Sequence, residues 1–193
     1  MGGTGMKTIV VFASGNGSNF AAMANAFQPS HNIRIALLVC DQPGAPVLQL
    51  ADKYHVPTLV VDYRDFKNKA AAETHIVAHI PSCDLVVLAG FMRIIGPTLL
   101  NAYPNRIINL HPALLPSFPG RTGIADAYNY GVKVTGVTVH YVDAGIDSGQ
   151  IIAQAPVPVL PDMTLNDLET TIHEIEHVLL PQTVAMLLAT LDA

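Results

Sequence analysis

A short segment, Asn109-Leu110-His111-Pro112, carries two side chains suited to acyl chemistry. In an extended chain, residues two apart point to the same side, so Asn109 and His111 can face one reacting centre. An amide NH₂ group can donate a hydrogen bond to a developing oxyanion. An imidazole can serve as a general acid or base near neutral pH. The alternative interpretation is a structural histidine that is hydrogen-bonded within a loop.

A second polar segment, Asp143–Gly149 (DAGIDSG), could bring a carboxylate to this histidine. Its two glycines permit a turn that directs Asp147 inward. A carboxylate beside His111 would stabilise the imidazolium form of the ring. The alternative is a polar hairpin turn whose aspartates are solvated. His140, just upstream, is predicted to be a strand histidine rather than a catalytic one.

A glycine-rich segment, Ser14–Asn19 (SGNGSN), follows a β-branched run and precedes the Ala-rich stretch FAAMANAF. Glycines let backbone N–H groups approach an anion closely, and the start of the following helix favours negative charge. The segment lacks the Lys of a P-loop and the spacing of a dinucleotide fingerprint, so it suits a single phosphate better than a triphosphate. The alternative is a tight strand-to-helix turn with Ser18 as the helix N-cap.

A fourth segment, Ala89–Ile95 (AGFMRII), is an apolar strand end that contains one arginine. Its apolar side chains could line a pocket that accepts an aromatic ligand. They could equally be part of an ordinary hydrophobic core.

Strands and helices that alternate along the chain must position these segments. Apolar and β-branched runs predict strands, and Ala-rich stretches between them predict helices. Strands buried on both faces indicate a doubly wound, largely parallel sheet with helices on both faces, an α/β fold of the Rossmann type. Ligands of such sheets bind at the carboxyl ends of the strands, where SGNGSN, GFMR and NLHP are expected to converge. The predicted strands are 7–13, 33–40, 58–61, 84–89 and 106–109, and helices are predicted over about 45–54 and 66–80.

The second half of the chain follows a different pattern. Leu110–Gly123 contains three prolines and two glycines, which predicts a long loop, and such loops are usually functional. Strands are expected over 135–141 and 150–159, on either side of the DAGIDSG turn, as an antiparallel C-terminal portion. Thr164 is the predicted N-cap of the last helix, with Asp167 completing a capping box. This helix is expected to reach about Leu188, with an interruption at Pro181.

Composition narrows the class of protein. The length of 193 residues predicts one domain spanning 1–193. Because 50% of the residues are hydrophobic and only 13% are charged, the composition excludes a disordered chain. The net charge of −5 argues against a nucleic-acid-binding surface. Two cysteines, Cys40 and Cys83, are expected to be reduced thiols of a cytoplasmic protein.

Three features bear on what else binds and on the chain ends. No Cys/His cluster has the spacing of metal ligands, so no metal site is predicted. No apolar run reaches the length needed to span a membrane. The opening MGGTG, residues 1–5, is not a signal peptide and is interpreted as a vector-derived tag before Met6. The sequence is compatible with a monomer or a homodimer.

Taken together, the four segments resemble the glycinamide ribonucleotide formyltransferase family. Its members share SGxGSN after the first strand, then VLAGFMRI, NxHPxLLPxFPG and GxTVHxVDxxxDxGxII. This chain has FASGNGSN, VVLAGFMRI, NLHPALLPSFPG and GVTVHYVDAGIDSGQII in the same order, from Lys7 to the last helix. The resemblance implies a formyltransferase-like fold. It also implies transfer of a formyl group from the co-substrate 10-formyltetrahydrofolate to the primary amine of glycinamide ribonucleotide, in purine biosynthesis.

The resemblance also implies roles for individual residues. Asn109, His111 and Asp147 would form the catalytic trio: the amine attacks directly, and Asn109 and protonated His111 stabilise the oxyanion with support from Asp147. The implied substrate-binding residues are Gly17, Ser18 and Asn19 for the phosphate, Glu176 for the ribose, and His173, where the family often has Gln. The implied folate contacts are Phe91, Met92, Arg93, Ile94, Ile95, Asn109, Val142, Asp143 and Lys69. The family has Arg where Lys69 stands, and Lys cannot make the planar bidentate contact of Arg.

Related enzymes share the trio, so the acceptor has alternatives. A formyltetrahydrofolate deformylase transfers the formyl group to water but carries an additional N-terminal domain. A methionyl-tRNA formyltransferase carries a C-terminal nucleic-acid-binding domain. The GNGSN segment and the absence of either extension favour the ribonucleotide. A non-catalytic folate- or nucleotide-binding protein on the same scaffold is an alternative from another class.

Overall fold

A seven-stranded sheet forms the centre of the computed structural model, which describes residues 5–27 and 32–191. Its strands are β1 (Lys7–Ala13), β2 (Ile33–Cys40), β3 (Thr58–Val60), β4 (Leu85–Leu88), β5 (Ile107–His111), β6 (Val134–Tyr141) and β7 (Ile151–Pro158). The spatial order is β3-β2-β1-β4-β5-β6-β7. Strands β1 to β5 are parallel, and β6 is antiparallel to both β5 and β7. The predicted fold class is confirmed. Of the predicted tag, only Gly5 is among the described residues.

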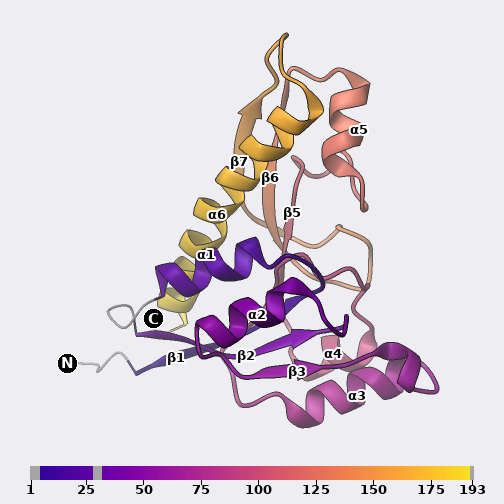
Figure 1. Cartoon of the computed structure of the whole chain (residues 1–193), viewed down its shortest axis with the longest axis vertical. Helices are drawn as coiled ribbons and strands as arrows, with labels where there is room; N and C mark the ends of the chain where they lie inside the picture. The colour runs from indigo at the N-terminus through magenta and orange to yellow at the C-terminus, as the bar shows by residue number, and fades with distance from the viewer. Residues whose placement is uncertain (1–4, 28–31, 192–193) are drawn as a thin grey trace.

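Helices cover both faces of the sheet (Figure 1). They are α1 (Ser18–Ala26), α2 (Pro46–Lys53), α3 (Lys69–His79), α4 (Pro97–Ala102), α5 (Gly123–Tyr130) and α6 (Leu165–Thr190), with a short 3₁₀ turn at Tyr63–Asp65. Buried side chains of α1, α2 and α6 share one hydrophobic cluster, whereas α3 and α4 contribute to a second cluster on the opposite face.

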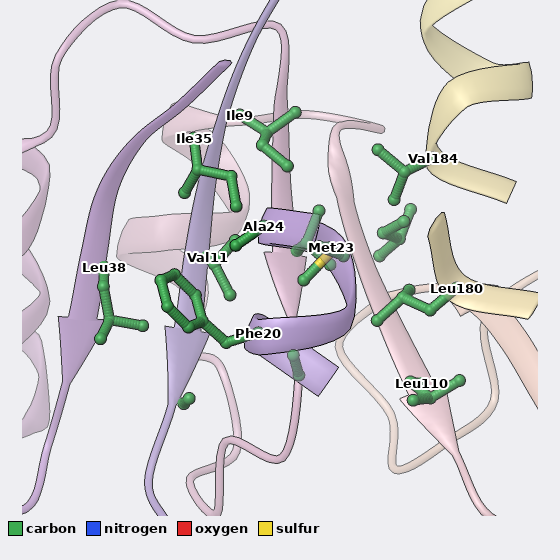
Figure 2. Close-up of a cluster of buried hydrophobic side chains, with 14 of the residues drawn as sticks. Ile9, Val11, Phe20, Met23, Ala24, Ile35, Leu38, Leu110, Leu180 and Val184 are labelled. Carbon is green, nitrogen blue, oxygen red and sulfur yellow. The ribbon is translucent and has the colours of Figure 1, made fainter. Parts of the chain in front are cut away.

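The alternation of side chains along β1 explains why two cores exist. All five residues from Ile9 to Ala13 are buried. Ile9 and Val11 belong to the α1/α2/α6 cluster, of which Figure 2 shows a part, while Val10 and Phe12 belong to the α3/α4 cluster. Because successive side chains of a strand point to opposite faces, a strand covered on both sides reads as a continuous apolar run.

The last helix corrects one prediction. Thr164 caps α6, and its reciprocal capping box with Asp167 is confirmed. The expected interruption at Pro181 is wrong, because α6 continues through it to Thr190. Proline removes one backbone donor from a helix interior. Here the residues on either side of it, Leu180 and Val184, are fully buried against the sheet, so tertiary packing outweighs that loss.

Several boundaries also differ from the sequence expectation. The helix predicted over 66–80 is α3, which begins at Lys69 rather than Phe66. Asn68 is its N-cap, because the Asn68 side chain accepts a hydrogen bond from the N–H of Ala71. Strand β5 extends to His111, so this residue lies on a strand and not in the following loop. The short helices α4 and α5 were not predicted.

Candidate active site

A cavity of about 870 Å³ lies where the carboxyl ends of β1, β4 and β5 meet. It is lined by the loop that starts α1, the segment after β4, the end of β5, the segment 142–147 and one side of α6. The predicted convergence of SGNGSN, GFMR and NLHP is therefore confirmed. All the residues predicted to bind or react line this cavity except Lys69.

The ring of His111 is held in one orientation at the floor of the cavity. The residue is 3% exposed, and its Nε2 lies 2.8 Å from the carbonyl oxygen of Phe118. Because a carbonyl can only accept, Nε2 carries a hydrogen in this arrangement. The other nitrogen, Nδ1, lies 3.5 Å from Oδ2 of Asp147. Nδ1 is therefore the ring nitrogen that faces the carboxylate. Because Nε2 is engaged by the backbone, Nδ1 is also the nitrogen that could contact reacting atoms.

Asp147 reaches the histidine from a loop rather than from a strand. Its backbone has a φ of +50°, in the left-handed region, and its Oδ2 accepts a hydrogen bond of 2.8 Å from the N–H of Gly120. At the end of this loop, a Cβ on Gly149 would come within 1.7 Å of the carbonyl oxygen of Tyr141. The predicted inward turn is thus present, and it requires a glycine at position 149 because of close backbone approach.

His140 is a member of this cluster that the sequence interpretation assigned only to a strand. It does lie on β6, where the antiparallel register pairs it with Asn109. Its Nδ1 lies 2.9 Å from the carbonyl oxygen of Tyr141, and its Nε2 lies 3.2 Å from Nδ2 of Asn109. Burial lowers the pKa of His140, which keeps the ring neutral. Neutral His140 donates from Nδ1 and accepts at Nε2, so it orients the amide of Asn109.

The glycine-rich loop forms one end of the cavity. Gly17 is the residue preceding α1 and has a φ of +75°, and a Cβ on it would lie 2.4 Å from Cγ2 of Val47. Ser18 is the first residue of the helix and not its cap. Residues 15–19 line the cavity, which leaves the N-terminus of α1 open to an anion.

Side chains of α6 complete this end of the cavity. Asn19 donates from Nδ2 to Oε2 of Glu176 over 3.1 Å, and the same oxygen lies 2.9 Å from Nδ1 of His173. The hydrogen bond to Glu176 raises the pKa of His173. Two buried atoms of residues that line the cavity, Asn19 Oδ1 and His177 Nε2, have no hydrogen-bond partner among the described residues.

The opposite end of the cavity is an apolar wall, Phe91–Ile95. Phe91 and Ile95 are buried, and the ring of Phe91 packs edge-on against Phe12. Met92 and Ile94 are 53% and 55% exposed on the cavity side. The two interpretations of this segment therefore both apply, because all five residues line the cavity while Phe91 and Ile95 are also part of the core.

Comparison with known proteins identifies the family of the chain that forms this cavity. A family model described as formyl transferase matches residues 7–184. The chain belongs to the formyl transferase family.

The similarity extends over nearly the whole chain. A phosphoribosylglycinamide formyltransferase of Bacillus subtilis is 45% identical over 186 residues, 95% of each chain. Glycinamide ribonucleotide transformylase 1 from Geobacillus kaustophilus is 49% identical in sequence, and its crystal structure matches with a TM-score of 0.92. The match covers 95% of this chain and 99% of that one. The corresponding protein from Symbiobacterium toebii is 37% identical with a TM-score of 0.93, covering 98% and 90%. These relatives confirm the family resemblance, and this chain is a formyltransferase.

The formyl transferase cavity has further members to which the sequence analysis assigned no binding or catalytic role, although several stand within its motifs. They lie beside predicted residues and include Gly15, Asn16, Gly120, Arg121, His140 and His177. Lys69 lies elsewhere: it is the first residue of α3, and its Cε is 2.9 Å from where a Cβ of Gly96 would stand. The nearby Arg64 pairs with Asp62 on the surface.

No group of three or more His, Cys, Asp and Glu side chains in residues 5–27 and 32–191 is arranged to hold a metal ion. Within the same ranges, none of the formyl transferase helices combines the length and the apolar character needed to cross a bilayer.

Proposed function

We propose that the protein transfers the formyl group of 10-formyltetrahydrofolate to the primary amine of glycinamide ribonucleotide, in purine biosynthesis. The observation that carries the proposal is one continuous cavity with three chemically distinct parts. An anion-binding loop lies at one end, an apolar wall at the other, and the Asn109–His111–Asp147 cluster between them. Phosphate, folate ring and reacting groups would each meet matching protein chemistry.

The ribonucleotide would occupy the end formed by α1 and α6. Its phosphate would accept hydrogen bonds from the backbone of Gly17, Ser18 and Asn19, favoured by the helix N-terminus. Its ribose hydroxyls would donate to Glu176, whose carboxylate is already oriented by Asn19 and His173. The amine would then point toward the catalytic cluster.

The folate would occupy the apolar end. Its ring would lie against the wall Phe91–Ile95 and the segment Val142–Asp143, which lines the same cavity. The formyl carbon would lie next to Asn109. Lys69 remains a proposed contact of the folate, although it does not line the cavity.

The chemistry follows from the geometry of the cluster. The amine nitrogen attacks the formyl carbon, and the carbonyl electrons move to an oxyanion. The amide N–H of Asn109 that is not directed at His140, together with the Nδ1–H of protonated His111, would stabilise that oxyanion. The carbon–N10 bond of the folate then breaks, the former amine loses a proton and N10 gains one. Asp147 supports the imidazolium and helps relay the proton, through a water if needed.

A steady-state assay tests the proposal. The absorbance change on deformylation of a 10-formyl folate analogue is followed with and without glycinamide ribonucleotide. We expect turnover only when the ribonucleotide is present. Equal turnover without it would indicate a deformylase that uses water, and no turnover in either case would indicate a non-catalytic binding protein. We also infer a cytoplasmic enzyme, monomeric or homodimeric, that acts on small molecules and not on nucleic acid.

A further inference from the structure

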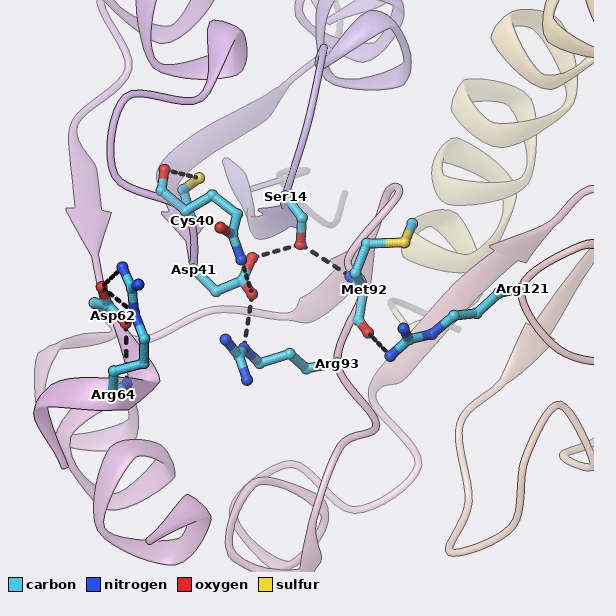
Figure 3. Close-up of polar contacts among 9 residues, drawn as sticks. Ser14, Cys40, Asp41, Asp62, Arg64, Met92, Arg93 and Arg121 are labelled. Carbon is cyan, nitrogen blue, oxygen red and sulfur yellow. Dashed lines mark hydrogen bonds and ion pairs between the residues drawn. The ribbon is translucent and has the colours of Figure 1, made fainter. Parts of the chain in front are cut away.

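A buried carboxylate lies directly behind the apolar wall and does not line the cavity. Asp41 immediately follows β2 and is 2% exposed. Its Oδ2 accepts hydrogen bonds from Nε of Arg93 over 2.7 Å and from Nε2 of Gln42 over 3.1 Å, and its Oδ1 accepts from the hydroxyl of Ser14 (Figure 3). A buried charge is tolerated only when it is paired and hydrogen-bonded in this way.

These hydrogen bonds reach two consecutive residues of the wall. The hydroxyl oxygen of Ser14 accepts a hydrogen bond of 2.9 Å from the N–H of Met92. Arg93 is held by Asp41 on one side, and its Cζ lies 4.2 Å from the ring centre of Tyr63 on the other. The carbonyl of Met92 accepts a further hydrogen bond from Arg121 over 3.0 Å. Both backbone polar groups of Met92 are therefore fixed.

The carboxylate also sets the direction of the hydrogen bonds. A carboxylate can only accept, so the hydroxyl hydrogen of Ser14 must point to Asp41 and a lone pair must face the N–H of Met92. Its partners Ser14, Gln42 and Arg93 all act as donors toward it. An amide at position 41 would remove the charge that pairs with Arg93 and would present a donor to Ser14 or to Arg93, so the hydrogen bonds that hold the wall would be weakened or redirected.

We propose that Asp41 is a positioning residue for the formyl donor. Through Ser14 it fixes the backbone at Met92, and through its ion pair it holds the side chain of Arg93, a residue that lines the cavity. The wall is thereby preformed, so that ordering it on binding costs little. The identity of the ligand as a formyl folate rests on the proposed function. The positioning role predicts an effect on the donor and not on the ribonucleotide.

The test compares Asp41→Asn with a matched variant at another strand. Asp84 precedes β4 at the opposite end of the sheet, and its carboxylate accepts a hydrogen bond of 2.7 Å from the N–H of Thr8. For Asp41→Asn we expect the KM for 10-formyl folate to rise about tenfold, as loss of charged hydrogen bonds implies. The kcat and the KM for the ribonucleotide should stay within about twofold, below the scale of a hydrogen bond. For Asp84→Asn both KM values should be unchanged, even if its melting temperature falls.

A second variant keeps the test decisive if Asp41→Asn does not fold. Ser14→Ala leaves the ion pair of Asp41 with Arg93 intact and removes only the link to Met92. We expect a smaller rise in the KM for the donor, and a rise in the double variant with Asp41→Asn that is less than the product of the two separate rises, because the Ser14 link depends on the carboxylate that Asp41→Asn removes. An unchanged donor KM in Ser14→Ala would overturn the proposal. So would equal rises in both KM values, or a fall in kcat alone, in Asp41→Asn. Failure of the wild type to use formyl folate would instead reject the proposed function.

Discussion

The two sides of the catalytic cluster are built in different ways. Asn109 and His111 lie on β5, a strand inside the sheet, and neighbouring strand and loop atoms fix both side chains. Asp147 lies on a loop between β6 and β7, in a left-handed backbone conformation, and its carboxylate is held by the N–H of Gly120 on another loop. The strand side is preformed by the fold, whereas the loop side depends on a few local contacts. Variants on the two sides should therefore fail differently.

The largest effect is expected on the strand side. His111→Ala removes the imidazole that faces the reacting centre, and the loss of one oxyanion donor lowers kcat on the order of 10²–10³. The protein should still fold, with a far-UV circular dichroism spectrum like that of the wild type. His79→Ala, an exposed histidine on α3, is the control and should be fully active. Near-normal turnover in His111→Ala would remove this residue from the mechanism.

On the loop side, Asp147→Ala removes the partner of His111 but leaves the oxyanion donors in place. We expect kcat to fall on the order of 10², somewhat less than for His111→Ala. The side chain is only 15% exposed and also binds the N–H of Gly120, so local order of both loops should decrease. Single-turnover kinetics would measure the chemical step. An unaltered rate would show that the loop carboxylate takes no part.

A smaller effect separates loop geometry from loop chemistry. In Gly149→Ala the new Cβ would meet the carbonyl of Tyr141, which is backbone, so the loop carrying Asp147 must shift. We expect kcat to fall about tenfold, in keeping with the steep dependence of catalysis on position. Gly145→Ala is the matched control, because its Cβ would meet mainly the movable hydroxyl of Ser148. Equal activity of the two variants would contradict a positional role for this loop.

The smallest effect concerns pH and the strand side. Burial lowers the pKa of His140 in the folded protein, so the unfolded chain binds a proton at higher pH than the folded one. The associated stability is fully present above the ordinary pKa of about 6.5 and is lost as pH falls toward the folded pKa. We therefore expect the free energy of unfolding, measured with urea, to fall more steeply for the wild type than for His140→Gln between pH 7 and pH 5, a window of about two units.

His173 provides the opposite case and serves as the control for this experiment. Glu176 raises its pKa, so its contribution is present below about 6.5 and is lost as pH rises through the folded pKa. Removing it by His173→Gln should change the pH dependence in the opposite direction. If both variants changed the slope of the free energy of unfolding against pH in the same direction, the pH dependence would arise from other groups.

The sequence predicted what is periodic or concentrated in one motif. The apolar run Ile9–Ala13 predicted a central strand, and the glycines of SGNGSN predicted the turn before α1. The short helix α4 was missed because its six residues are too few for a periodic pattern, and the eight-residue helix α5 was missed as well. The break expected at Pro181 was wrong because packing of α6 on the sheet is not visible in local propensity.

Contacts between distant residues were the hardest to anticipate. His140 pairs with Asn109 across 31 positions, and only the antiparallel register of β5 and β6 places them together. Asp41 and Arg93 are separated by 52 positions and share no motif. Such partners follow from the strand order, which side-chain periodicity does not specify.

The fate of the formyl group would show directly whether the ribonucleotide is its acceptor. The enzyme is incubated with a 10-formyl folate whose formyl carbon is isotopically labelled and with glycinamide ribonucleotide, and the products are analysed by mass spectrometry. We expect the label to be recovered on the amine of the ribonucleotide, one label for each folate deformylated. Recovery of the label as free formate, at the same rate with and without the ribonucleotide, would contradict it.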